Sequence, residues 1–72
     1  MKQPEQITLD SDEFEALRLV DLLKMQQQHA AIQIGVSRQT LANVLKSARF
    51  KLMDCLTHGK ALLMKNAPEE KL

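Results

Sequence analysis

The sequence is poor in the residue types that mark many kinds of functional site. It has no tryptophan or tyrosine, two phenylalanines and a single cysteine among its 72 residues. A lone Cys55 closes no internal disulfide and belongs to no paired metal-ligand pattern, so we expect no metal site and a reducing compartment. No run approaches the roughly 18 apolar residues of a membrane span, and the first ten residues lack a signal-peptide core. These absences predict a cytoplasmic protein that has no membrane partner.

Catalytic signatures are also missing. The chain has no glycine-rich phosphate loop, and no spacing pairs a nucleophile with a base, so we expect neither an enzyme nor a cofactor. The net charge is only +1, but it is divided unevenly along the chain. Residues 1–35 carry three basic and six acidic side chains, whereas residues 36–60 carry five basic and one acidic. Such asymmetry is typical of nucleic-acid binding, although a solvated, charged helix face gives a similar pattern.

A first helix is predicted to begin after Asp10. Its carboxylate suits an N-cap, and Glu13 stands three residues later, as in a capping box. We therefore assign the acidic residues here to capping rather than to catalysis or metal binding. The helix should end near Lys24, and its buried stripe is predicted to be Ala16, Leu19, Val20 and Leu23.

Two further helices are predicted around Gly35. The first covers roughly residues 27 to 34, and Gly35 stands where a left-handed backbone ends a helix at the lowest cost. Ser37 is a good N-cap for the next helix, which meets no helix-breaker until Gly59 and is about 30 Å long. The apolar stripe of this long helix is predicted to be Leu41, Val44, Leu45, Ala48, Leu52, Cys55 and Leu56.

The two ends of the chain carry short apolar segments. Residues 6–9 alternate like a strand, and residues 61–64 are too short to classify by their period. The two segments are expected to pair either within one chain or between two, and residues 65–72 are expected to fray. The predicted fold is thus all-α: a single three-helix helix-turn-helix domain over residues 1–72, with a core over about 9–58, a long third helix and short terminal strands.

The helix-turn-helix interpretation depends on counting outward from Gly35. If Gly35 is the ninth position of a 20-residue unit, small or apolar residues occupy every position at which the two helices should touch. An ordinary helical hairpin with a polar outer face would satisfy the same pattern, but residues 36–53 contain no acid at all. The six contact positions are Ala30, Ala31, Ile34, Val36, Leu41 and Val44.

The outward residues at the start of the long helix form a candidate set for reading DNA. Arginine pairs with guanine through two hydrogen bonds, and Gln and Asn pair likewise with adenine. Hydroxyls and lysine suit phosphates, which fix register rather than sequence. The predicted DNA-binding residues are Ser37, Arg38, Gln39, Thr40, Ala42, Asn43, Lys46 and Arg49.

Three segments together resemble a known family. They are "LDSDEFEALRLV", "GVSRQT" and "ARFKLMDCLTHGKAL", and the likeness covers roughly residues 7 to 63. The sequence resembles small bacterial and archaeal proteins of unknown function that are predicted to bind DNA, and the middle segment is similar to region four of primary sigma factors. The resemblance implies a three-helix DNA-binding fold with Ser37, Arg38, Gln39 and Thr40 at reading positions. This chain departs from the family at "QQQHA", where a serine cap and acidic residues are usual.

Phe50 and Met53 lie one helical turn apart and off the main apolar stripe. We predict that they form a homodimer contact together with Leu62 and Leu63, because two protomers about 34 Å apart would read a two-fold site. The alternative is that Phe50 packs on residues 6–9 of its own chain.

Taken together, these patterns predict a sequence-specific regulator of transcription that binds double-stranded DNA as a homodimer. The alternative is a helical protein-interaction module whose basic helix meets an acidic partner, such as RNA polymerase or another transcription protein.

Overall fold

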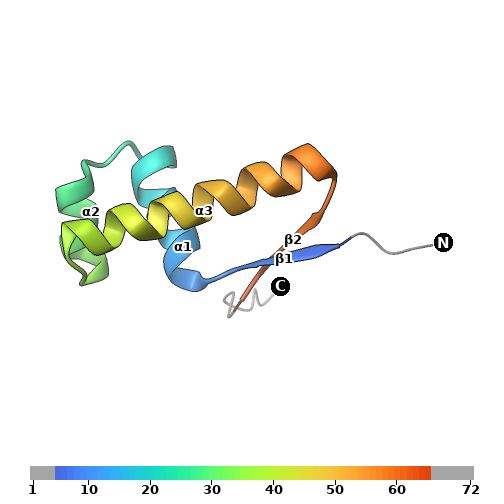
Figure 1. The fold of residues 1–72 in the computed structure, drawn as a ribbon. Coiled ribbons are helices and arrows are strands. Elements are labelled where there is room, and N and C mark those ends of the chain that lie inside the picture. The colour runs from blue at the N-terminus through green and yellow to red at the C-terminus, as the bar shows by residue number, and fades with distance from the viewer. Residues whose placement is uncertain (1–4, 66–72) are drawn as a thin grey trace, which may run out of the picture.

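The computed structural model describes residues 5–65, so the predicted fraying of residues 65–72 falls, beyond Lys65, outside the described residues. Within these residues the chain forms three helices and two short strands (Figure 1). In chain order these are β1 (Gln6–Leu9), α1 (Ser11–Ala16) with its π-helical continuation η1 (Leu17–Leu22), α2 (Gln27–Ile34), α3 (Arg38–His58) and β2 (Ala61–Met64).

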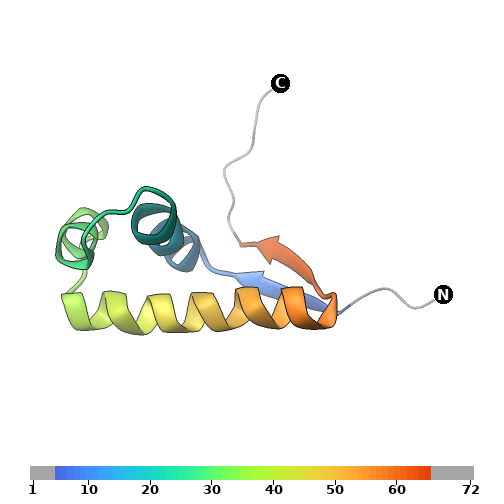
Figure 2. The ribbon, with the colours of Figure 1, turned by 90° about the horizontal axis from the view of Figure 1, so that it is seen from above.

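Helix α3 is the element on which all the others pack. It has 21 residues, and α2, α1 and the strand pair lie along one side of it, in that order from its N-terminal to its C-terminal end (Figure 2). The core is made by leucines from α3 and η1, chiefly Leu19, Leu41 and Leu45, and by alanines that let the helices approach closely. The buried alanines are Ala16, Ala30, Ala31 and Ala48.

Helices α2 and α3 follow the sequence prediction closely. Helix α2 has the predicted bounds, Gly35 ends it with a φ of 91°, and Ser37 caps α3. Gly59, with a φ of 64°, then ends α3. These boundaries depend on local residue preferences, which the sequence displays directly.

The first helix departs from the prediction in its second half. Over η1 the backbone widens to a π-helix, in which the Leu23 N–H donates to the Arg18 carbonyl five residues earlier. Each residue of a π-helix rotates about the helix axis by a smaller angle than a residue of an α-helix. Residues at α-helical spacing therefore no longer lie on one face. The prediction that Leu23 is buried is therefore wrong: it is 53% exposed, and its neighbour Leu22 is 72% exposed. The helical segment ends at Leu22, and Lys24 just beyond it has a φ of 61°.

One residue of the predicted stripe of α3 is also exposed. Leu56 lies beyond the reach of α1 and α2, and the strands cover only the side of α3 that carries Cys55. There the buried Cys55 Sγ lies 4.0 Å from the carbonyl oxygen of Ala61. Burial at this end of α3 is thus decided by the strand pair rather than by another helix.

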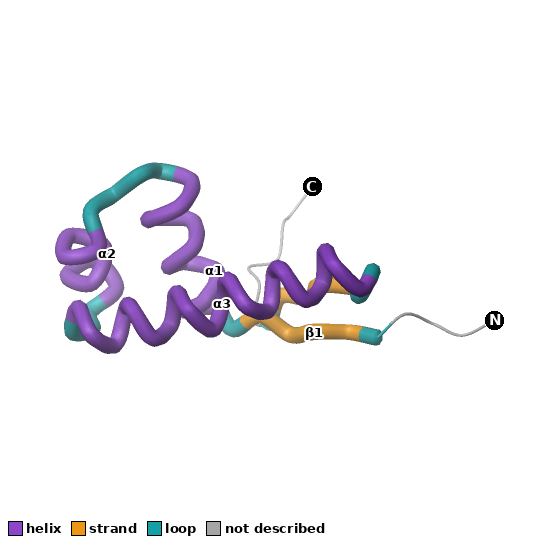
Figure 3. Tube along the Cα trace, turned by 45° about the horizontal axis from the view of Figure 1, so that its top comes forward, coloured by secondary structure: helices purple, strands orange, loops and turns teal. Residues whose placement is uncertain are grey.

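The two strands lie side by side (Figure 3). They pair within one chain and run parallel. Gln6 is paired with Ala61 and Leu9 with Met64, so the whole helical part of the chain connects them. Because the sheet is an integral part of the structure, the fold is mostly helical with a two-stranded parallel sheet rather than all helical. The prediction of short terminal strands is confirmed, and the pairing is intramolecular.

Candidate nucleic-acid interface

The turn between α2 and α3 is closed by backbone hydrogen bonds. The N–H groups of Gly35 and Val36 both donate to the carbonyl of Ala31, at 2.8 and 2.9 Å. Ser37 then caps α3, with its Oγ accepting from the Thr40 N–H at 3.1 Å. Two residues, Gly35 and Val36, thus separate the end of α2 from the cap of α3, which fixes the direction in which α3 leaves the turn.

All six residues predicted to lie between these two helices contribute to the core. Ala30, Ala31 and Leu41 are buried, and the other three pack against the same cluster. Ala31 is 2% exposed, so a larger side chain at this position would push α2 away from α3. The three partly buried members are Ile34, Val36 and Val44.

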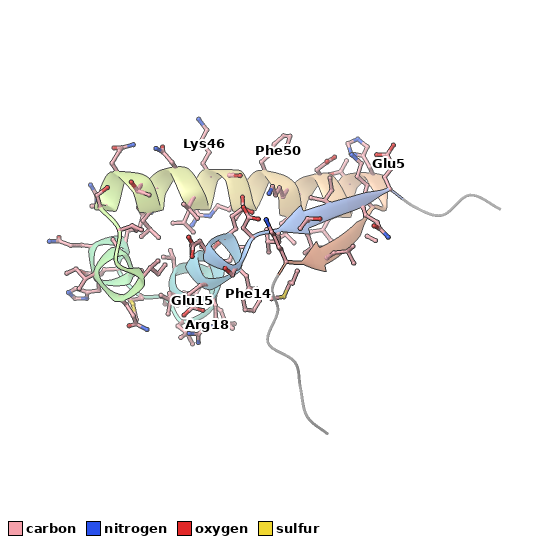
Figure 4. All side chains as sticks on the ribbon, turned by 90° about the horizontal axis from the view of Figure 1, so that it is seen from below. Glu5, Phe14, Glu15, Arg18, Lys46 and Phe50 are labelled. Carbon is pink, nitrogen blue, oxygen red and sulfur yellow. The ribbon has the colours of Figure 1, made fainter. Side chains whose placement is uncertain are left out.

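The side of α3 that faces away from the rest of the molecule carries one continuous row of exposed residues. Their spacings alternate between four and three, which keeps them on one face of an α-helix. Figure 4 shows two of them, Lys46 and Phe50, projecting from the same side of α3, away from the other elements. We call this row the outer stripe, and it consists of Gln39, Asn43, Lys46, Phe50 and Met53.

The outer stripe changes character along its length. Its N-terminal half is polar and basic, and the amide groups of Gln39 and Asn43 are hydrogen-bonded to each other at 3.3 Å. Its C-terminal half is apolar, since Phe50 is 71% exposed and Met53 is 57% exposed. The alternative in which Phe50 packs on β1 is therefore wrong, because the ring points away from the strands (Figure 4).

Most of the predicted DNA-binding residues are exposed around the start of α3, and Ala42 is partly buried. Arg38 lies beside Gln26, Gln27 and Gln28 at the N-terminus of α2, so it extends the polar surface toward that helix. The hydroxyls of Ser37 and Thr40 are 2.9 Å apart and hydrogen-bonded to each other.

Arg49 is the predicted residue whose surroundings differ from the expectation. Its Nη2 and Nε donate to the carboxylate of Asp21 on η1, at 2.6 and 3.1 Å. These hydrogen bonds, and the charge of Arg49, hold the pKa of Asp21 below its usual value, although burial acts in the opposite direction. The pair links η1 to α3, so the Arg49 guanidinium is already occupied within the chain.

The buried carboxylate of Glu13, next to α3, has more partners than the capping role predicted from the sequence. Glu13 does accept from the Asp10 N–H at 2.9 Å, as the capping box requires, but it also accepts from Ser47 Oγ at 2.6 Å and Lys51 Nζ at 2.8 Å. Burial alone would raise its pKa, but the hydrogen bonds and the charge of Lys51 outweigh it, and the pKa of Glu13 is lowered. Because Glu13 and its partners are more than thirty residues apart, no local pattern could have indicated the contact.

The acidic residues of α1 border one side of the candidate interface. A polar depression of about 500 Å³ lies between α1 and α3, with Asp10 and Asp12 on one wall and Thr40 and Asn43 on the other. Phosphates on this side would meet carboxylates, whereas the outer stripe itself carries no acid. The charges therefore favour an anionic group at the outer stripe and disfavour one near α1.

The predicted dimer residues fall on two separate surfaces. Leu62 lines an apolar groove with Leu9, Phe14 and Leu52. Leu52 follows Phe50 by two residues, which is about 200° around the helix axis. Phe50 therefore lies on the opposite side of α3 from Leu62, and one two-fold contact cannot bury both residues.

Two features are absent from residues 5–65. No helix there is long and apolar enough to cross a membrane. No three His, Cys, Asp or Glu side chains in that range gather closely enough to hold a metal ion.

Fold and surface together define a small, mostly helical protein that exposes an acid-free polar helix face. Comparison with known sequences then gives its family. The sequence model described as "protein of unknown function DUF134" matches residues 1–71, and the chain belongs to this family.

Relatives in several bacteria are similar over most of the chain. A UPF0251 protein of Aeromonas salmonicida is 69% identical over 64 residues, which are 89% of this chain and 63% of the relative. A UPF0251 protein of Vibrio cholerae is 61% identical over 62 residues, 86% of this chain and 63% of the relative. The chain therefore spans a little under two thirds of the length of these relatives. No solved structure matches it.

Proposed function

We propose that this protein binds double-stranded DNA and regulates transcription, with α2, the Gly35 turn and α3 acting as a helix-turn-helix. The observation that carries the proposal is the N-terminal half of the outer stripe. It is exposed, acid-free and rich in amide and basic side chains, and it begins at a helix N-terminus beside a tightly packed turn. In helix-turn-helix docking, this is the part of the second helix that enters the major groove.

The residues divide by the kind of contact that they suit. Arg38, Gln39 and Asn43 carry the paired donors and acceptors that read base edges. Because Gln39 and Asn43 are hydrogen-bonded to each other, they present a single oriented surface rather than two independent side chains. Lys46, Ser37 and Thr40 suit the phosphates, and Ala42 leaves room for close approach. Arg49 joins these contacts only if it leaves Asp21.

The first experiment is selection of bound duplexes from a random pool, followed by gel shifts at several salt concentrations. With about four phosphate contacts, affinity should fall about 100-fold between 50 and 200 mM salt. The double substitution Arg38→Ala with Asn43→Ala should weaken binding to the selected site about 30-fold or more. Gln33→Ala, an exposed amide on α2, is the matched control and should leave affinity unchanged.

The alternative, a protein-interaction module in the transcription machinery, is favoured by one observation. Phe50 and Met53 put exposed apolar surface directly beyond the polar half of the outer stripe. Such a module would show no DNA binding even at about 50 mM salt. If the folded double variant binds the selected duplex as well as the wild type, reading by α3 is refuted.

A further inference from the structure

The sheet has one open edge among the residues that the structure describes. In a parallel ladder, alternate residues of each strand direct both backbone groups toward the neighbouring strand. The Ala61 N–H donates to the Glu5 carbonyl and the Lys65 N–H to the Leu9 carbonyl, which places residues 61, 63 and 65 on the inner side. The N–H and C=O groups of Leu62 and Met64 therefore point outward, away from β1.

The opposite edge of the sheet is closed. On β1 the outward residues are Gln6 and Thr8, and the carbonyl of Thr8 accepts from Lys51 Nζ at 2.9 Å. A lysine from α3 thus covers that edge with a charge, which is a usual protection against strand addition. Nothing comparable protects β2 within residues 5–65, since its four residues are uncharged.

We propose that β2 is a self-association edge, which pairs antiparallel with β2 of a second copy of this chain. The outward N–H and C=O groups of the two β2 strands face each other in one register. In this register Leu62 exchanges backbone hydrogen bonds with the partner's Met64, and Met64 exchanges them with the partner's Leu62. Every outward N–H and C=O of β2 then has a partner. The two-fold axis passes beside Leu63, which faces the partner's Leu63, and two marginal ribbons become one four-stranded sheet.

Charge and burial favour this register. Lys65 lies opposite the partner's Ala61, so it does not face its own copy. Lys60 at the other end is already paired with Asp54 at 2.9 Å and with Glu5 at 3.3 Å. Leu63, at the centre of the contact, is 43% exposed in the single chain and has apolar surface to bury. Two copies thus meet without opposed like charges and with apolar side chains at the axis.

This edge competes with the other candidate surface for a second copy. Phe50 projects from the side of α3 that faces away from the strands (Figure 4), so a copy on β2 leaves it exposed. A copy on Phe50 and Met53 would likewise leave β2 open. The two arrangements predict opposite results for substitutions at residues 50 and 63, whether or not the protein binds DNA.

The test is sedimentation equilibrium of the full chain at concentrations up to about 1 mM. Wild type should approach the mass of a dimer. Leu63→Lys and Leu63→Glu should each be monomeric, because like charges then meet at the axis, and an equimolar mixture of the two should recover the dimer mass. Recovery also shows that both variants are folded. Phe50→Glu is the control and should keep the dimer.

Amide exchange supplies a second measurement on the unmodified chain. The N–H groups of Leu62 and Met64 should become slower to exchange as concentration rises, whereas that of Leu63, bonded within the chain, should not change. The proposal is overturned if wild type stays monomeric, if Leu63→Lys leaves the dimer intact, if the mixture remains monomeric, or if Phe50→Glu alone abolishes the dimer.

Discussion

Replacing Glu13 with glutamine tests whether the buried carboxylate holds α1 on α3. Its side chain is 8% exposed, and that of its partner Lys51 is 28% exposed. The amide introduced by Glu13→Gln keeps an oxygen for Ser47 or for the Asp10 N–H but loses the charge that Lys51 faces. Hydrogen bonds to charged groups contribute about 1.5–3 kcal/mol, so we expect a loss of about 2 kcal/mol in the free energy of unfolding. In a domain of this size the melting temperature should fall by about 10 °C.

The dependence on pH makes this prediction more specific. Because the pKa of Glu13 is lowered by folding, its ionised form stabilises the folded state at pH 7. This contribution is complete above the unfolded pKa of about 4.3 and is lost as the pH falls through the lower, folded value. The difference between wild type and Glu13→Gln, measured by urea denaturation with circular dichroism, should therefore be large at pH 7 and should shrink toward pH 3.

The matched control is Glu15→Gln on the same helix. Glu15 pairs with Arg18 at 2.9 Å, but both side chains are more than one third exposed. An exposed pair of this kind contributes about 0.5 kcal/mol or less. If Glu13→Gln is no more harmful than Glu15→Gln, or if its effect is equally large at pH 3, the reasoning about the buried contact is refuted.

Two other predictions concern the backbone and the Asp21–Arg49 pair. Gly35→Ala should lower the free energy of unfolding by about 1–2 kcal/mol, measured by urea denaturation; a Cβ there meets no atom within 4 Å, so the cost comes from the positive φ alone. Lys24→Gly, its counterpart at a non-glycine residue with positive φ, should change stability by about 0.5 kcal/mol or less. Asp21→Asn should reduce the free energy of unfolding by less than about 0.5 kcal/mol. It should also steepen the slope of log K against log salt concentration for DNA binding by about 0.9, because Arg49 becomes available to a phosphate. An unchanged salt slope would show that Arg49 lies away from DNA.

The parts of the fold that sequence predicted correctly are those with local causes. Gly35 and Ser37 mark their own boundaries because one tolerates a positive φ and the other supplies a capping oxygen. The bounds of α2 and α3 follow from these signals and from the 3.6-residue period. Short terminal strands were also anticipated, but their parallel pairing depends on where the helices place the two ends of the chain.

The errors arose where the backbone departs from the α-helical period or where distant contacts decide the outcome. The widening of η1 moves Leu23 out of the predicted stripe, and the strands leave Leu56 exposed. At the candidate interface, sequence indicated Arg49 as a free cation, but Asp21 reaches it from a segment 28 residues away. Periodicity describes one helix at a time, so it contains no information on which side chains of another helix come within reach.

The parallel pairing of β1 and β2 has a consequence for the order of folding. Gln6 pairs with Ala61, so this contact forms only after nearly the whole described chain has been brought back on itself. The turn and helix contacts from α2 to α3 are local and can form early. The strand pair should therefore be the last element to assemble and the first to open, leaving α2 and α3 joined.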